Sequence, residues 1–375
     1  MNGRFILGIQ LVSSIFFMSC NKLSEEGTGD GRADVTDVPL QVNMALSASK
    51  VDTKGIFGEV GTEAGKIGSV GVLVVKGASG SYASYTATES DTYSVFEYKA
   101  AQSSGSNPTW EPKDSKNIIL NNVDGTVFAW APLGSGNLGD APTIGGSALT
   151  VSGVKVSKSQ TFDAKTNRSD CSQIDYLYGL SGDATSSGHQ TVNKTNATAE
   201  LYMHHALAKV SFKVMKKDDD PVPGVNDYVK KIVLTSANTK FIAKDNGMTM
   251  SLVDGTLSDG TEVKELSFTA TIGNAAQAAA YASDYTAVTV QAYGLVAPVA
   301  ETTNDLSIAL TLGSNNTQTA NDRTYSTGTQ SKTTLKWEKG KEYIYTIQVS
   351  DKSLVVTSVT IVDFAPQTEV ALPVE

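Results

Sequence analysis

The sequence predicts an all-β protein with two β-sandwich domains in tandem. Short apolar segments recur at roughly ten-residue spacing between clusters of Gly, Asn, Ser and Pro, a pattern typical of sandwiches and open barrels. No long segment repeats its apolar residues with the helical period of ~3.6 residues, so we expect helices to be minor. The length of 375 residues fits about two domains of ~150 residues each.

The composition favours a structural or binding protein over an enzyme. Lys and Arg number 30 against 39 Asp and Glu, which gives a formal net charge of -9. Because phosphate binding needs clustered Lys and Arg, we expect no nucleic-acid partner. Three His and two Cys leave little material for a metal cluster or a thiol site. We therefore expect no catalytic site, no metal and no cofactor.

The N-terminus has the features of a lipoprotein signal peptide, residues 1–19. Arg4 precedes an apolar run, residues 5–18, which is too short for a stable membrane anchor. Ser19-Cys20 at its end resembles a bacterial lipobox. In a lipobox the Cys is lipidated, so Cys20 would carry acyl chains such as palmitate. The other interpretation is an ordinary signal peptide with a chance Cys. The acidic residues 21–26 that follow resemble the tether of an exported surface lipoprotein.

A half-buried strand is predicted directly after this tether. Apolar residues stand at every second position, and Pro39, Gln41, Asn43, Ala45 and Ser47 fill the alternate positions. A period of two over this length indicates a strand with one buried face. We call residues 38–46 the N-terminal strand; its apolar positions are Val38, Leu40, Val42, Met44 and Leu46.

Two series of further strands are predicted, joined by a polar, turn-rich linker at 181–198. The first series is 70–76, 93–98, 118–120, 127–130, 149–156 and 176–180. The second is 199–214, 228–235, 248–252, 265–272, 286–292, 306–312, 343–349 and 354–364. The Ala-rich stretch 274–282 is expected to hold a short helix capped by Asn274. The expected domains are therefore 55–197 and 198–375, with 20–54 as a removable prosegment.

Several motifs in this order and spacing resemble those of the fimbrillin family, the type V pilins of Bacteroidetes-type bacteria. They are the lipoprotein start at Cys20, the strand and aromatic-small-Pro turn at 123–132, the His-Ala-Leu-Ala-Lys-Val segment at 205–210, and the W-x-x-G-x-x-Y-x-Y hairpin that begins at Trp337. The resemblance covers almost the whole chain.

The resemblance implies two transthyretin-like, Greek-key sandwiches and a polymer built by strand exchange. A trypsin-like protease cuts the lipoprotein precursor, the N-terminal strand leaves, and a C-terminal strand of another subunit replaces it. The implied partners are other fimbrial subunits, in a homo-polymer or with tip and anchor proteins, and the implied location is a fimbrium on the outer membrane. The host or bacterial surface ligand is not specified by the sequence.

Two positions are candidates for the proteolytic cut. Cleavage between Lys54 and Gly55 matches the family's layout and would free the whole strand, although the family usually has Arg before the cut. Cleavage between Arg32 and Ala33 has the expected Arg but would leave the strand in place. A third interpretation is that this subunit stays uncut as a membrane anchor.

The C-terminal tail is the predicted donor strand. Val370, Leu372 and Val374 alternate with other residues beyond the last strand that the second sandwich requires. Pro373 disfavours this segment as a central strand of its own sheet. The alternatives are a closing edge strand of the second domain, or donation by the strand at 354–364.

A monomeric surface lipoprotein that binds glycans is the competing function. Sandwich scaffolds serve both roles, so the fold alone does not decide between them. A polymer subunit needs a removable strand and a spare C-terminal strand, whereas a glycan binder should present two or three aromatic side chains on one loop face.

Replacing Cys20 with Ala should abolish lipid attachment and leave the precursor outside the outer membrane. The several acyl chains of a bacterial lipoprotein bury methylenes worth ~0.8 kcal/mol each, which is sufficient for stable anchoring. Metabolic labelling with a palmitate probe measures this directly. Unchanged labelling of Cys20→Ala would show that Cys20 is not the lipidated residue.

Overall fold

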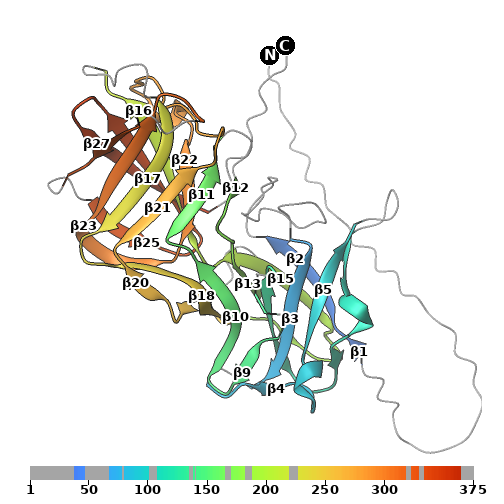
Figure 1. Ribbon diagram of the computed structural model, residues 1–375. Helices are drawn as coiled ribbons and strands as arrows, with labels where there is room; N and C mark the ends of the chain where they lie inside the picture. Colours follow the sequence, from blue (N-terminus) through green and yellow to red (C-terminus); the bar gives the residue numbers. More distant parts are fainter. Residues whose placement is uncertain are drawn as a thin grey trace, which may run out of the picture. The chain divides into compact units, whose positions relative to one another are not determined.

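The computed structural model describes residues 38–46, 67–77, 80–100, 108–134, 138–139, 141–164, 170–181, 188–218, 227–317, 322–328 and 333–364. All of them belong to one compact unit, residues 37–375. The predicted all-β class is confirmed, since these residues form strands and three short 3₁₀ turns: η1 (Glu89–Asp91), η2 (Lys113–Ser115) and η3 (Tyr285–Ala287) (Figure 1). No helix among them has the length and apolar character needed to cross a membrane.

A nine-stranded sheet contains the N-terminal strand at one of its edges. Its order is β2 (Gln41–Leu46), β15 (Thr198–His205), β13 (Leu177–Ser181), β8 (Gly125–Ala131), β3 (Ser69–Lys76), β5 (Tyr93–Lys99) and β6 (Thr109–Pro112). Two short strands, β14 (Thr191–Val192) and β4 (Ala83–Ser84), pair with β8 and β3. β1 (Val38–Pro39) forms a separate pair with β7 (Ile119–Leu120).

Two sheets contain most of the strands of the second half of the chain. The seven-stranded sheet has the order β12 (Asp170–Cys171), β11 (Ser159–Asp163), β21 (Glu265–Ala270), β17 (Tyr228–Ser236), β23 (Val299–Gly313) and β24 (Arg323–Ser326), and β25 (Thr333–Trp337) also pairs with β23. The four-stranded sheet has the order β22 (Ala292–Val296), β16 (Ala208–Lys216), β26 (Lys341–Val349) and β27 (Leu354–Asp363).

Strand pairing also joins the two halves of the sequence. In a five-stranded sheet, β10 (Ala148–Val156) pairs with β18 (Phe241–Ser251), beside β9 (Thr143–Gly145), β19 (Leu257–Ser258) and β20 (Thr261–Val263). In the seven-stranded sheet, β11 runs parallel to β21. Residues 148–163 therefore pair with strands of the second half, which their position in the sequence does not suggest. The predicted boundary between residues 197 and 198 stays a prediction.

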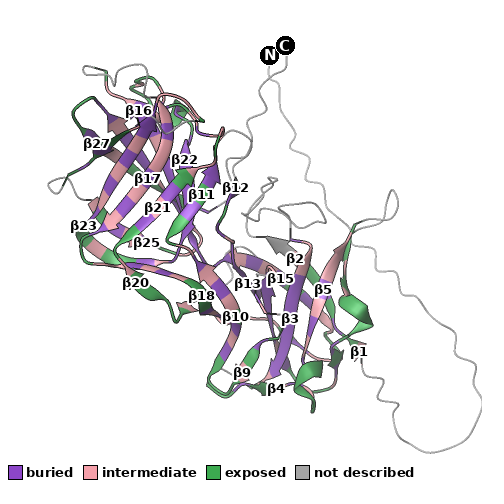
Figure 2. Ribbon diagram, in the orientation of Figure 1, coloured by how far each residue is buried: buried purple, intermediate pink, exposed green. Residues whose placement is uncertain are grey.

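The buried hydrophobic residues form two clusters. Figure 2 colours all buried residues purple. The larger cluster draws on residues from Leu73 to Phe364 and includes Trp130 and Trp337. The smaller one lies within residues 40–203 and includes side chains of the N-terminal strand. The N-terminal strand therefore contributes to a core that the first half of the chain builds.

Four local predictions were wrong. The predicted strand 286–292 is not a strand, because η3 occupies 285–287 and β22 begins only at Ala292. The predicted strand 199–214 is two strands, because Ala206 and Leu207, both fully buried, separate β15 from β16 and place them in different sheets. The Ala-rich stretch 274–282 holds no helix; isolated backbone bridges tie Ala279 to Met215 and Gln277 to Tyr228. Part of the predicted linker belongs to the sheet, since β14 pairs with β8.

Gly71 in β3 should tolerate no side chain. A Cβ atom at this position would lie 2.1 Å from Trp130 Cε2, and the indole is held because Nε1 donates to the Gly139 carbonyl at 2.9 Å. We expect Gly71→Ala to lower the free energy of unfolding by about 1–3 kcal/mol through overpacking. Gly145→Ala is the control, because its nearest neighbour would be 3.8 Å away. Equal denaturation midpoints for the two variants would contradict this assignment.

Candidate functional site

The N-terminal strand changes partners along its length. Val38 and Pro39 pair antiparallel with Leu120 and Ile119. The Leu40 N–H then donates to the Ile118 carbonyl at 2.9 Å. From Gln41 onward the strand pairs with β15 in parallel, from Gln41 opposite Thr198 to Leu46 opposite Met203. The segment therefore spans two separate strand edges, and both edges lose their partner if it leaves.

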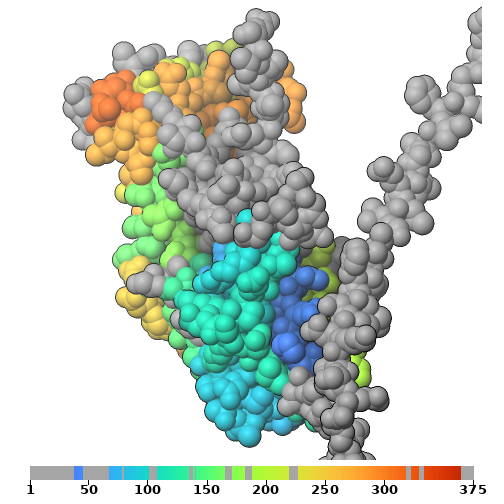
Figure 3. Space-filling view, turned by 90° about the vertical axis from the view of Figure 1, so that its right-hand side faces the viewer, coloured from blue at the N-terminus to red at the C-terminus, as the bar shows by residue number. Residues whose placement is uncertain are grey.

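The predicted alternation of this strand is confirmed where its side chains are described. Leu40 and Val42 are each 3% exposed and belong to the smaller hydrophobic cluster, and Met44 packs against that cluster. Gln41 and Asn43 face outward and are exposed. Figure 3 shows residues 38–46 as blue atoms at the surface beside residues drawn in teal. The strand is therefore reachable from outside while its apolar side chains point inward.

The inward side chains occupy a groove with apolar walls. The side chains of the smaller cluster around Leu40 and Val42 are Ile67, Val70, Val72, Val74, Tyr85, Phe96, Ile118, Leu120, Val127, Ala129, Ala131, Leu177, Val192, Ala199, Leu201 and Met203. Met44, Trp110 and Ala197 pack against them from partly buried positions. We call the outer edge of β15, residues 197–203, the acceptor edge, because it receives the strand.

Polar contacts along the acceptor edge are few. The Gln41 N–H donates to the Ala197 carbonyl at 2.8 Å. Asn43 Nδ2 donates to Glu200 Oε1 at 2.7 Å, on the exposed face of the sheet. Burial of Leu40 and Val42 contributes about 1.5–3 kcal/mol for each side chain. Any other strand with similar side chains at the same spacing would gain a comparable free energy, so the site does not require this particular sequence.

The remaining sequence-predicted positions lie outside the described residues. This applies to the lipidation position Cys20, to both cleavage candidates, Lys54-Gly55 and Arg32-Ala33, and to the donor tail with Val370, Leu372 and Val374. The structure describes the chain up to Phe364, at the end of β27. β27 is an edge strand with exposed apolar side chains, among them Val355 and Ile361 at 44% and 55% exposure.

A buried polar cluster at the end of β15 was not predicted. His205 Nδ1 lies 2.9 Å from Asp175 Oδ2, and both residues are buried. The His205 ring stacks on Phe364 with centroids 4.1 Å apart. Nearby, Lys209 and Glu342 form a buried ion pair at 3.3 Å. Removing one partner of either pair would leave an uncompensated buried group. The contact that joins the end of β15 to the end of β27 is the stacking of His205 on Phe364.

The other histidines are packed into the structure. The His189 ring packs against Phe128 at a tilt of 38°, with centroids 4.2 Å apart, and its Nε2 lies 2.9 Å from the Val253 carbonyl. Burial lowers the pKa of His189 and of His204 below the usual value of about 6.5. His205 is buried, whereas His189 and His204 are partly buried. Cys171 is buried, and its thiol donates to the Gln173 carbonyl at 3.5 Å.

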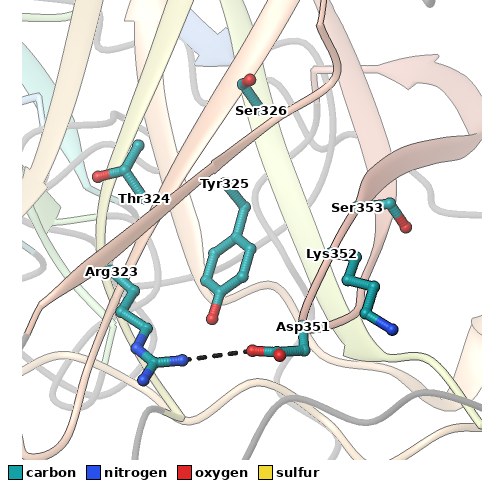
Figure 4. Close-up of a pocket in the computed structure, with 7 residues that line it drawn as sticks. All are labelled: Arg323, Thr324, Tyr325, Ser326, Asp351, Lys352 and Ser353. Carbon is teal, nitrogen blue, oxygen red and sulfur yellow. Dashed lines mark hydrogen bonds and ion pairs between the residues drawn. The ribbon is translucent and has the colours of Figure 1, made fainter.

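A polar pocket of about 480 Å³ lies between β24 and the turn that joins β26 to β27. Figure 4 shows Arg323 and Asp351 paired across it, at 3.3 Å, with the Tyr325 hydroxyl directed toward them. Tyr325 is buried and offers no ring face to a sugar. In the described part of the chain, Tyr281 is the one exposed aromatic residue, at 45% exposure; the others are partly or fully buried. The clustered aromatic face that a glycan binder should present is therefore not formed by the described residues.

Shortening Val42 should loosen the N-terminal strand selectively. Val42→Ala removes buried methyl groups worth about 2 kcal/mol from the groove. We expect hydrogen exchange of the β2 and acceptor-edge amides to become about 30-fold faster, since local opening becomes easier. Gln41→Ala, one residue away on the exposed face, is the control and should leave exchange unchanged. Equal exchange in both variants would show that Val42 does not hold the strand.

The sequence profile of the fimbrillin-like family matches residues 71–363, which is most of the chain. No curated protein matches it in sequence. Among solved structures, a candidate cell adhesion protein from Bacteroides uniformis is 18% identical, with 88% of this chain and 99% of the other covered and a TM-score of 0.49. A fimbrial protein from Bacteroides vulgatus is 14% identical, with 79% and 93% covered and a TM-score of 0.49. From its profile match, the chain belongs to the fimbrillin-like family.

Proposed function

We propose that this chain is a subunit of an adhesive fimbrium and that it polymerises by exchanging its N-terminal strand for a strand of another subunit. The strongest support is the way in which the N-terminal strand is held in the fold. It is an edge strand, it changes partners midway, and it buries Leu40 and Val42 in a core built by other strands. Family membership supports the fimbrial role.

Loss of the N-terminal strand would leave the acceptor edge without a partner. An unpaired edge beside an apolar groove strongly favours the addition of another strand, because backbone hydrogen bonds supply affinity and the side-chain pockets supply specificity. In this proposal the cut falls between Lys54 and Gly55, after the strand, and the lipid on Cys20 holds the precursor at the outer membrane until then. The partners are other fimbrial subunits, and the role is structural rather than enzymatic.

Cutting the purified precursor after Lys54 should convert monomers into polymers. Trypsin acts first on exposed loops, so a brief treatment should spare the sheets. Size-exclusion chromatography and electron microscopy measure the products. The control carries Lys50→Ala, Lys54→Ala and Lys66→Ala, which removes every Lys between the N-terminal strand and β3, and it should remain monomeric under the same treatment. If cut chains that have lost residues 38–46 stay monomeric at high concentration, strand exchange is not their mode of assembly.

A charged residue on the inward face of the N-terminal strand should release the strand without proteolysis. Val42→Asp would bury an unpaired carboxylate, at a cost of several kcal/mol, so the strand should leave its groove without cleavage. We expect this variant to polymerise uncut. Gln41→Asp adds the same charge to the exposed face of the same strand and should stay monomeric. Polymerisation of both variants, or of neither, would contradict the role assigned to the groove.

A further inference from the structure

We propose that, once the N-terminal strand has left, the chain's own C-terminal tail, residues 369–375, pairs with the acceptor edge and runs antiparallel to β15. The inference rests on the proposed function in one respect, namely that the N-terminal strand leaves. The subunit then closes on itself, and assembly requires a tail from another subunit to displace its own. Three observations on the edge, on the tail and on the position of Phe364 support this direction and this occupant.

The acceptor edge presents the backbone groups of particular residues. The N-terminal strand is parallel to β15, with Gln41 opposite Thr198, and the Gln41 N–H donates to the Ala197 carbonyl. In this register the odd-numbered residues of β15 point their backbone groups at the edge. The same odd-numbered residues, Ala199 and Leu201 among them, bury their side chains in the groove.

The direction of an incoming strand, parallel or antiparallel to β15, determines which of its residues must donate an N–H to the acceptor edge. In a parallel strand the outward-facing residues donate to β15, as Gln41 does. In an antiparallel strand, residues directly opposite one another share a face, so the inward-facing residues donate instead. The tail places Val370, Leu372 and Val374 inward and Pro373 outward. Because Pro has no N–H, a parallel tail would leave a β15 carbonyl unpaired, whereas an antiparallel tail would lose no backbone hydrogen bond to β15.

Phe364, the last described residue before the tail, lies at the end of β15 from which an antiparallel strand must begin. Phe364 is buried, stacks on the His205 ring, and donates its N–H to the Gly340 carbonyl at 2.7 Å. His205 is the last residue of β15, two positions beyond Met203, where the N-terminal strand ends at Leu46. A tail that leaves Phe364 along the acceptor edge therefore runs toward Thr198, against the direction of β15.

The tail is also long enough to make this connection within one molecule. If Val370, Leu372 and Val374 take the places of Met44, Val42 and Leu40, Glu369 comes opposite Tyr202. Residues 365–369 span up to about 17 Å when extended, and Tyr202 is three residues from His205, or about 10 Å along the strand. In this register the uncharged Ala371 faces Glu200. A tether this short gives an effective concentration of order mM, so closure within one chain should precede exchange between chains.

A disulfide between the tail and the acceptor edge tests the proposal. The full chain carries Cys20→Ser and Cys171→Ala, together with Glu369→Cys and Tyr202→Cys, and is oxidised at high dilution before and after cutting at Lys54. Outward-facing antiparallel pairs of this kind have Cα atoms about 4.5 Å apart, which suits a disulfide. We expect a bond within one chain, only after cutting, at a rate independent of protein concentration. A disulfide from Glu369→Cys to His204→Cys, instead of to Tyr202→Cys, would still mean that the tail runs antiparallel to β15.

Two matched variants separate the alternatives. A bond from Glu369→Cys to Thr198→Cys rather than to Tyr202→Cys would overturn the antiparallel direction. Pro373→Ala should leave the yield of the disulfide between Glu369→Cys and Tyr202→Cys unchanged, because the restored N–H points away from β15. A several-fold rise in that yield would also contradict the antiparallel direction of the tail.

The products also separate this inference from the proposed function. Disulfides found only between chains, in growing polymers, would overturn closure by the chain's own tail and leave strand exchange standing. Chains that lose residues 38–46 but neither form the bond nor polymerise would contradict strand exchange itself. Deleting residues 367–375 should leave the cut chain with an open groove, detected as several-fold stronger binding of an apolar dye. Equal dye binding by the full-length cut chain would contradict closure.

Discussion

The pairing of the N-terminal strand with β15 is the interaction on which the first half of the structure depends. β15 is paired with β13 on one side and with β2 on the other, and its inward side chains complete the same cluster that holds Leu40 and Val42. Because β2 is an edge strand, its removal interrupts no ladder between other strands. The sheet can therefore lose this strand and keep its order, but it cannot keep its apolar groove covered.

The end of β15 couples this groove to the C-terminal end of the chain. His205 pairs with Asp175 and stacks on Phe364, and Lys209 Nζ lies 5.9 Å from the centroid of the same Phe364 ring. Lys209 in turn pairs with Glu342 on β26. The stacking of Phe364 on His205 therefore places Phe364 at the same end of β15 as the point where the N-terminal strand ends. A packed core alone would not require this particular geometry.

The sequence reveals the features that depend on local periodicity. The alternation at residues 38–46 predicts both the strand and its buried face, and Leu40, Val42, Gln41 and Asn43 lie as predicted. Periodicity does not identify the partner of a strand, so neither the parallel pairing with β15 nor the pairing of β11 with β21 was predicted. These pairings depend on contacts between residues far apart in the chain.

The missed break at Ala206-Leu207 has a different cause. The stretch from Leu201 to Val210 contains no Gly, Pro or Asn to indicate a turn, and its apolar residues continue through 206–208. The polar cluster around His205 was missed for a related reason, since Asp175 and Phe364 meet it only in the folded chain. The composition shows only three histidines, but it indicates no partner for any of them.

Mass spectrometry of assembled fibres tests the central claim, that residues 38–46 occupy a site meant for another strand. Fibres formed from cut precursor would be washed, dissociated and analysed for the fragment that ends at Lys54. If strands are exchanged, the fragment should be absent from the fibres. In unassembled precursor it should be present in the same amount as the remainder of the chain. Fibres that retain the fragment in equal amount would contradict strand exchange, because the acceptor edge would still hold its original partner.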